Sequence, residues 1–104
     1  KTGSILLVAL VLGSANAQTG APASNDMKKV MDSGMQSMQA MPRTGDTDKD
    51  FATMMKMHHQ QALDMAKVEL EHGKSPELKA MASKMIKDQT KEIEQLEKWL
   101  QKHK

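Results

Sequence analysis

The chain has 104 residues and a formal net charge of +2, with 11 Met, four His, one Phe, one Trp and no cysteine or tyrosine. A chain this short forms one small domain, and without cysteine it can use neither disulfides nor thiolate metal ligands. Acidic and basic side chains alternate along it, so no basic stripe points to nucleic acid. It also lacks a nucleophile–base set, a phosphate-binding glycine loop and a zinc-protease motif, and so gives no support for an enzyme.

Residues 1–17 have the pattern of a secretory signal peptide. Lys1 precedes an apolar run at 5–12, and Ala15-Asn16-Ala17 fits the small-x-small cleavage pattern. An uncleaved membrane anchor is the alternative, but the apolar run is too short to cross a bilayer. We therefore expect cleavage after Ala17, no stable membrane anchor in the mature chain, and a periplasmic or secreted location.

Residues 18–26 are small and polar and are expected to form a flexible segment. A helical domain is expected to follow at 27–104, and it opens with a first helix. This helix should begin after the N-cap candidates at 24–26 and end before Pro42. Gly34 weakens it. Five methionines of this helix fall within one arc of about 120°, and packing in a core is the simpler use of such a stripe. They are Met27, Met31, Met35, Met38 and Met41.

A second helix is expected from about Asp48 to His72 and a third from about Pro76 to Gln101. Gly73 should end the second helix as a left-handed cap, and Ser75 should cap the start of the third. The seam of the third helix is helical over about six turns; it consists of Leu78, Ala82, Met85, Gln89, Ile93, Leu96 and Leu100. The short linker predicts an antiparallel hairpin. The fold is therefore expected to be all-α, a small bundle made of a long helical hairpin and a shorter Met-rich N-terminal helix.

The strongest chemical signal is the run Met54-Met55-Lys56-Met57-His58-His59. Thioethers select Cu(I) among the common biological metals, and imidazole suits copper as well. Residues three or four apart are neighbours on a helix, which groups His58 with Met54 and Met65, and His59 with Met55. The two imidazoles point about 100° apart and should therefore anchor separate sites.

Further soft ligands are expected from Met57 in the same run and from Met81 and Met85 on the third helix, with auxiliary ligands from the first. The auxiliary set is Met27, Met31, Met35 and Met38. The expected ions are Cu(I) and Ag(I), with Cu(II) held through imidazole. His72 should interact with a helix C-terminus, and His103 should lie in a frayed, solvated tail. Glu69 and His72 form a single Glu-x-x-His motif, which is too little for a di-iron oxidase.

Two stretches of the sequence resemble an exported bacterial family catalogued as domain of unknown function number three hundred and five. They are Asp48-x-Asp50-Phe51-Ala52-x-Met54-Met55-x-x-His58-His59-Gln60-x-Ala62-x-x-Met65-Ala66 and Ser75-Pro76-Glu77-Leu78-Lys79-x-Met81-Ala82-x-x-Met85-Ile86-x-x-Gln89-x-x-Glu92-Ile93, the latter followed by Trp99-Leu100. The resemblance covers about residues 27–101 and implies a ferritin-like helical bundle. The family includes CopM-type periplasmic copper-binding proteins, so it also implies Cu(I) or Ag(I) bound by the matching Met and His residues. These are Met54, Met55, His58, His59 and Met65.

One position departs from the family pattern. The family usually has Ile-Pro before the His pair, where this chain has Lys56-Met57. Without that proline the second helix should run unkinked.

The sequence thus predicts an exported Cu(I)- and Ag(I)-binding protein that serves copper tolerance as a buffer or carrier. Its expected partners are copper ions, together with a second copy of the chain or a copper-receiving protein. The alternative is a metal-free helical interaction module, because adaptable Met-rich surfaces also bind other proteins.

Overall fold

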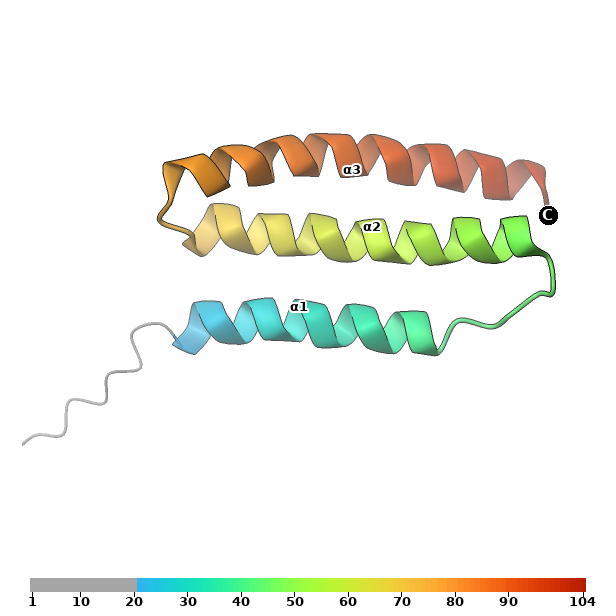
Figure 1. Cartoon of the computed structure of the whole chain (residues 1–104), viewed down its shortest axis with the longest axis horizontal. Helices are drawn as coiled ribbons and strands as arrows, with labels where there is room; N and C mark the ends of the chain where they lie inside the picture. The colour runs from blue at the N-terminus through green and yellow to red at the C-terminus, as the bar shows by residue number, and fades with distance from the viewer. Residues whose placement is uncertain (1–20) are drawn as a thin grey trace, which may run out of the picture.

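The computed structural model describes residues 21–104, with side chains from residue 25 onward, as three helices connected by short loops and without strands (Figure 1). The helices are α1 (Ala21–Gln39), α2 (Thr47–His72) and α3 (Pro76–Lys102). The predicted all-α fold and the antiparallel α2–α3 hairpin are confirmed. The proposed signal peptide lies outside the described residues. No helix in the described part of the chain is long and apolar enough to cross a membrane.

Polar side chains cap the N-termini of the two long helices. The Asp46 carboxylate accepts hydrogen bonds from the backbone N–H groups of Asp48 at 3.0 Å and Lys49 at 3.2 Å. The Ser75 hydroxyl accepts one from the Leu78 N–H at 3.2 Å, and proline follows Ser75 in the first turn of α3. These contacts satisfy N–H groups that have no partner within the helix. The predicted Ser75 cap is confirmed.

The predicted end of α2 at His72 is confirmed, but the predicted conformation of its cap and the predicted start of α1 are wrong. Gly73 has φ −68° and ψ 155°, an extended conformation, rather than that of a left-handed cap. Only three residues link α2 to α3, and the last of them, Ser75, is itself extended as the N-cap of α3. The backbone therefore becomes extended immediately after α2. In addition, α1 begins at Ala21, so the expected cap residues 24–26 lie within it. Pro22 stands in its first turn, where a missing N–H costs no helical hydrogen bond.

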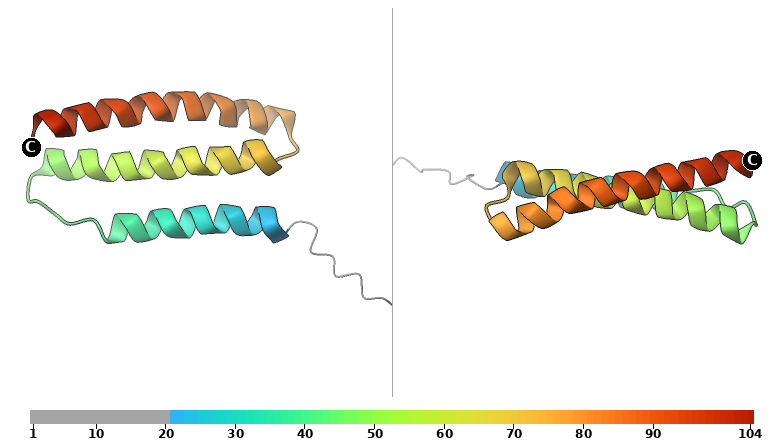
Figure 2. Two further views of the ribbon diagram at one scale, coloured as in Figure 1. Left: turned by 180° about the vertical axis from the view of Figure 1, so that it is seen from behind. Right: turned by 90° about the horizontal axis from the view of Figure 1, so that it is seen from above.

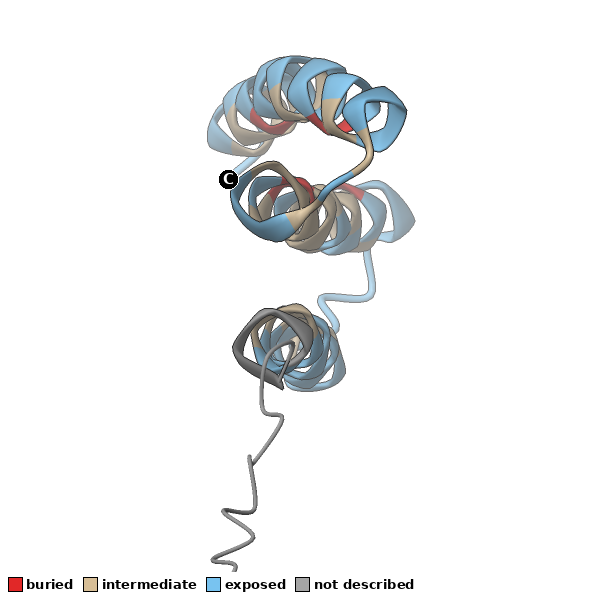
Figure 3. Cartoon of the chain, turned by 90° about the vertical axis from the view of Figure 1, so that its left-hand side faces the viewer, coloured by how far each residue is buried: buried red, intermediate tan, exposed pale blue. Residues whose placement is uncertain are grey.

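The three helices form a single layer with α2 in the middle (Figure 2). The buried core lies between α2 and α3 (Figure 3) and, among the side chains described, comprises five residues. These are Ala52, Leu63, Ala66, Ala82 and Ile93. Only two of them are large, so the hairpin encloses little apolar volume.

The contact between α1 and α2 centres on Gly34. A Cβ atom at this position would lie 2.7 Å from the Gln61 side chain, so glycine permits the close approach. The Gln61 amide donates a hydrogen bond to the Met31 carbonyl at 3.1 Å. The methionine stripe of α1 was expected to be core, yet Met31 is 43% and Met35 50% exposed. The reason is the single layer, in which α1 packs against one helix only.

Candidate metal centre

Four of the predicted ligand methionines line one groove, here called the methionine groove. It has a volume of about 310 Å³ and receives side chains from all three helices. The methionines are Met27 from α1, Met65 from α2, and Met81 and Met85 from α3. Three alanines, Leu78 and Glu69 complete the lining. Met81 and Met85 are one turn apart and share an edge of α3, and the antiparallel hairpin brings that edge beside Met65.

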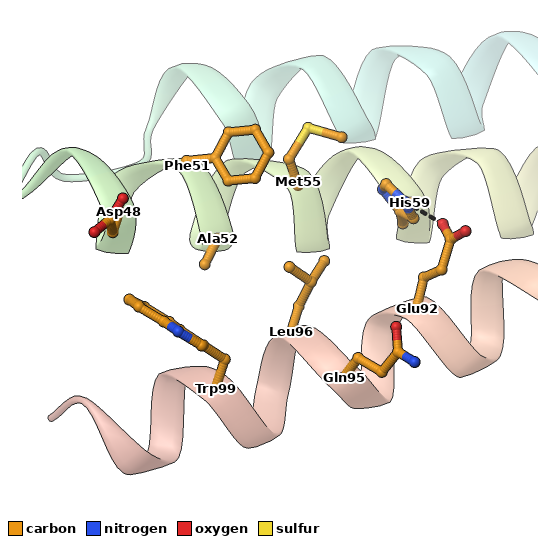
Figure 4. Close-up of a pocket in the computed structure, with 9 residues that line it drawn as sticks. All are labelled: Asp48, Phe51, Ala52, Met55, His59, Glu92, Gln95, Leu96 and Trp99. Atoms are coloured by element: carbon orange, nitrogen blue, oxygen red, sulfur yellow. Dashed lines mark ion pairs between the residues drawn. The ribbon is translucent and has the colours of Figure 1, made fainter.

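A second groove of about 680 Å³ lies further along the α2–α3 hairpin and is called here the histidine groove (Figure 4). Its lining is Asp48, Phe51, Ala52, Met55 and His59 from α2 with Glu92, Gln95, Leu96 and Trp99 from α3. Met55 stands one turn before His59 on the same edge of α2, as predicted from their spacing. The predicted pairing of these two residues is therefore possible within one groove.

The two ring nitrogens of His59 have different surroundings. Nε2 lies 2.5 Å from a carboxylate oxygen of Glu92, and the His59 side chain is only 15% exposed. Nδ1 is buried and has no hydrogen-bond partner. In a neutral ring that donates Nε2–H to Glu92, Nδ1 keeps its lone pair. A metal-binding histidine usually donates a hydrogen bond from its other ring nitrogen to a carboxylate or a similar acceptor. His59 therefore has the chemistry of a metal ligand.

His58 is placed differently. It is exposed, and its ring lies 6.4 Å from the His59 ring, centroid to centroid, at an interplanar angle of 65°. Met54, its expected partner, is 46% exposed. Met65, the other expected partner, lines the methionine groove with the α3 methionines. A separate site at His58 stays a prediction.

Met57 lies on the opposite side of the layer, in a polar groove between α1 and α2. The lining there is Lys29, Val30, Ser33, Gly34, Ser37, Lys56, Met57, Gln60, Gln61 and Asp64. Among the described residues, no second methionine lines this groove, whereas two ammonium groups and one carboxylate do. The structure therefore separates Met57 from the candidate ligands of the methionine and histidine grooves.

The exposed large apolar side chains gather on the face that carries the methionine and histidine grooves, here called the methionine face. Helical spacing places all seven there, opposite the polar groove; they are Met31, Met35, Phe51, Met54, Leu78, Met81 and Met85. The charged residues that line its two grooves are Asp48, Glu69 and Glu92, and all are acidic. The potential on this face therefore favours cations.

Clusters of imidazole, thiolate and carboxylate ligands are missing from the described part of the chain. No three His, Cys, Asp or Glu side chains of residues 21–104 come together in a way that could hold a metal ion. Glu69 and His72 do not form a joint site: Glu69 lines the methionine groove, whereas His72 pairs with Asp26 of α1 at 3.3 Å.

Asp50, part of the motif before the methionine run, holds the loop that joins α1 to α2. Its carboxylate accepts hydrogen bonds from the Thr44 N–H at 3.0 Å and the Thr44 hydroxyl at 2.8 Å. These donors lower the pKa of Asp50 below its ordinary value. The clamp gives Asp50 a structural role that spacing did not predict.

The C-terminal histidine is also better ordered than predicted. Helix α3 extends to Lys102, and the His103 ring stacks on Trp99 with centroids 4.0 Å apart and an interplanar angle of 13°. Its Nδ1 lies 2.7 Å from the Trp99 carbonyl. His103 is exposed, as expected, but the prediction of a frayed tail is wrong, because the ring packs on the last turn.

A comparison with known protein families shows the family to which the chain belongs. Residues 9–103 match the model of the family described as "Domain of unknown function (DUF305)". The chain belongs to this family. The match confirms the resemblance found in the paired Met-His and Ser-Pro stretches. In keeping with the missing proline, α2 is continuous through Lys56 and Met57. No curated protein is detectably similar in sequence.

Glu92 belongs to the family motif, but the sequence alone predicted no role for it at the site. A glutamate on a helix rich in charge carries no signal by itself. The hairpin does provide one, because residues at similar distances from the Gly73–Ser75 turn face each other in an antiparallel pair. His59 and Glu92 satisfy that condition, and so do Ala66 and Ala82, which are both buried.

Proposed function

We propose that this chain is a periplasmic or secreted binding protein for Cu(I) and Ag(I), acting as a buffer or carrier in copper tolerance. The observation that supports it best is the methionine groove, where three helices each contribute thioether sulfur to one small space. Thioethers are soft and uncharged, and they have no proton to lose, so they suit a soft monovalent cation. The copper ion is the cargo of this protein.

The histidine groove supports a second, mixed site. Met55 and His59 share its lining, and the unpartnered Nδ1 of His59 offers an imidazole lone pair. Imidazole binds both oxidation states of copper, so this is where Cu(II) would be held. Glu92 would keep the ring oriented through Nε2.

The open nature of the grooves favours buffering or transfer over permanent storage. None of the four groove methionines is buried, and Met81 is 56% exposed. An ion held here can be reached by a competing ligand from outside. The acidic linings add a long-range attraction for cations, which diminishes with ionic strength.

The test is an anaerobic titration of the full chain with Cu(I) against a competing chelator, repeated with Ag(I) and Zn(II). We expect Cu(I) and Ag(I) to bind much more tightly than Zn(II), since Zn(II) prefers the His, Cys and carboxylate clusters that residues 21–104 lack. Zn(II) affinity equal to or above that for Cu(I), under reducing conditions, would contradict the thioether site.

A metal-free interaction module is the second candidate, and the exposed methionine face favours it. Methionine side chains are flexible and polarizable and can adapt to varied partners. If the titration shows no Cu(I) or Ag(I) binding while the protein is folded, this second function takes precedence.

A further inference from the structure

The methionine face leaves a large apolar area without a partner. The described chain is one layer of helices, and globular domains normally need a second layer to enclose a core. Among the side chains described from residue 25 onward, the core consists of three alanines, one leucine and one isoleucine. A chain of this size with so small a core usually recovers stability by binding a metal or by oligomerising.

The exposed area matches what a protein–protein contact requires. The seven apolar side chains of the methionine face are each between 40% and 62% exposed. At about 200 Å² for a fully exposed large side chain, half exposure of seven residues gives about 700 Å². A stable interface of standard size buries about 800 Å² on each partner. The half-buried methionines of the two grooves supply the remainder.

We propose that a second copy of this chain covers the methionine face, so that two helical layers stack about a twofold axis. A twofold contact uses the same patch on both partners, so the patch must be compatible with itself. The charge distribution meets this condition. Asp48 lies in the first turn of α2, Glu69 near its end, and Glu92 is paired with His59. Between these carboxylates the two grooves are lined by uncharged side chains, and those are the side chains that a second copy would cover.

The self-association does not depend on copper. Met81 and Met85 belong both to the methionine groove and to the methionine face, so metal loading and dimerisation use the same side chains. For this reason the decisive experiment uses the metal-free protein. Absence of copper binding would leave this proposal intact, and absence of a dimer would leave the copper site intact.

The experiment is sedimentation equilibrium of the full chain, expressed for export, freed of metal, and with its N-terminus identified by mass spectrometry. We expect a reversible dimer and a melting temperature that rises with protein concentration, because association stabilises the folded state. Phe51→Glu and Leu78→Glu place a charge on the methionine face without altering a proposed copper ligand. Each should raise the dimer dissociation constant at least about tenfold. The matched control, Ser33→Glu with Ser37→Glu, alters exposed positions beside the polar groove and should leave the constant unchanged.

A second measurement covers the case in which the charged variants do not fold. The chain has no cysteine, so Leu78→Cys and Ser33→Cys each introduce a single thiol. Alkylation of the thiol at position 78 should slow as protein concentration rises, whereas that at 33 should not change. A monomer at every concentration, or equal alkylation at the two positions, would overturn the proposal. Two other results would also overturn the proposal. One is slow alkylation of the thiol at position 78 in a monomer that retains residues 1–17, and the other is protection of this thiol by a different, co-purifying protein.

Discussion

The pair of substitutions Met81→Leu and Met85→Leu separates a metal-binding role of the methionine groove from a packing role. Leucine nearly conserves the volume of methionine, and such swaps in a full core cost less than about 1.5 kcal/mol. Here the two side chains are 56% and 40% exposed, so only about half of each is packed. We therefore expect the metal-free double variant to lose less than about 1 kcal/mol of unfolding free energy per substitution. The apolar methionine face, and with it self-association, should be retained.

Copper affinity should respond very differently. The double variant removes two of the four thioethers that line the methionine groove. If each sulfur contributes about 1.4 kcal/mol, the dissociation constant for Cu(I) rises about 100-fold. The assay is the anaerobic chelator competition, with urea unfolding of the metal-free protein alongside. Met57→Leu is the matched control, since it makes the same chemical change in the polar groove. Undiminished Cu(I) affinity in the double variant, or an equal loss in the control, would refute the assignment of the groove.

Three further predictions concern the core, the histidines and the loop clamp. Ile93→Ala should lower the unfolding free energy by about 2–5 kcal/mol in urea titration, because Ile93 is one of the two large core residues; a loss below about 1 kcal/mol would contradict the small core. His58→Ala and His59→Ala should each remove part of the Cu(I) capacity, and only His59→Ala should also destabilise the fold; abolition of all binding by either one would mean a shared site. The lowered pKa of Asp50 means that its contact with Thr44 stabilises the fold above pH about 4 and is lost as pH falls toward the lowered value. The difference in melting temperature between the wild type and Asp50→Asn should therefore shrink from pH 5 to pH 2, and a constant difference would argue against the clamp.

The helices could be predicted from sequence because their signals are local. The spacing along α3 and the Ser75 cap depend on residues about one turn apart. Both predicted the helix correctly, although Leu78 and Met85 of the seam are exposed. The exposure of the α1 methionines could not be predicted. A stripe such as Met31 and Met35 fits equally well inside a bundle or on an open layer, and only tertiary packing distinguishes the two. The contact of Gly34 with Gln61 likewise depends on which helix lies beside α1.

The candidate site was predictable in its residue types and less so in its grouping. Helical spacing correctly placed Met55 beside His59 and Met81 beside Met85. Spacing within one helix cannot show that Met65 joins the α3 methionines, since that depends on the register of the hairpin. The same limit applies to Met57, which sits in the predicted run and yet lies on the opposite side of the layer. It also explains why the contact of Glu92 with His59 was not predicted.

X-ray absorption at the copper edge, on the full chain loaded anaerobically with one equivalent of Cu(I), tests the thioether site most directly. The technique identifies the atoms bound to copper without reference to the protein structure. If the methionine groove binds the first ion, sulfur should dominate the first coordination shell, and the sulfur signal should fall in the Met81→Leu, Met85→Leu variant and persist in Met57→Leu. A first shell made only of nitrogen and oxygen, unchanged by the groove substitutions, would contradict a copper site built on methionine sulfur.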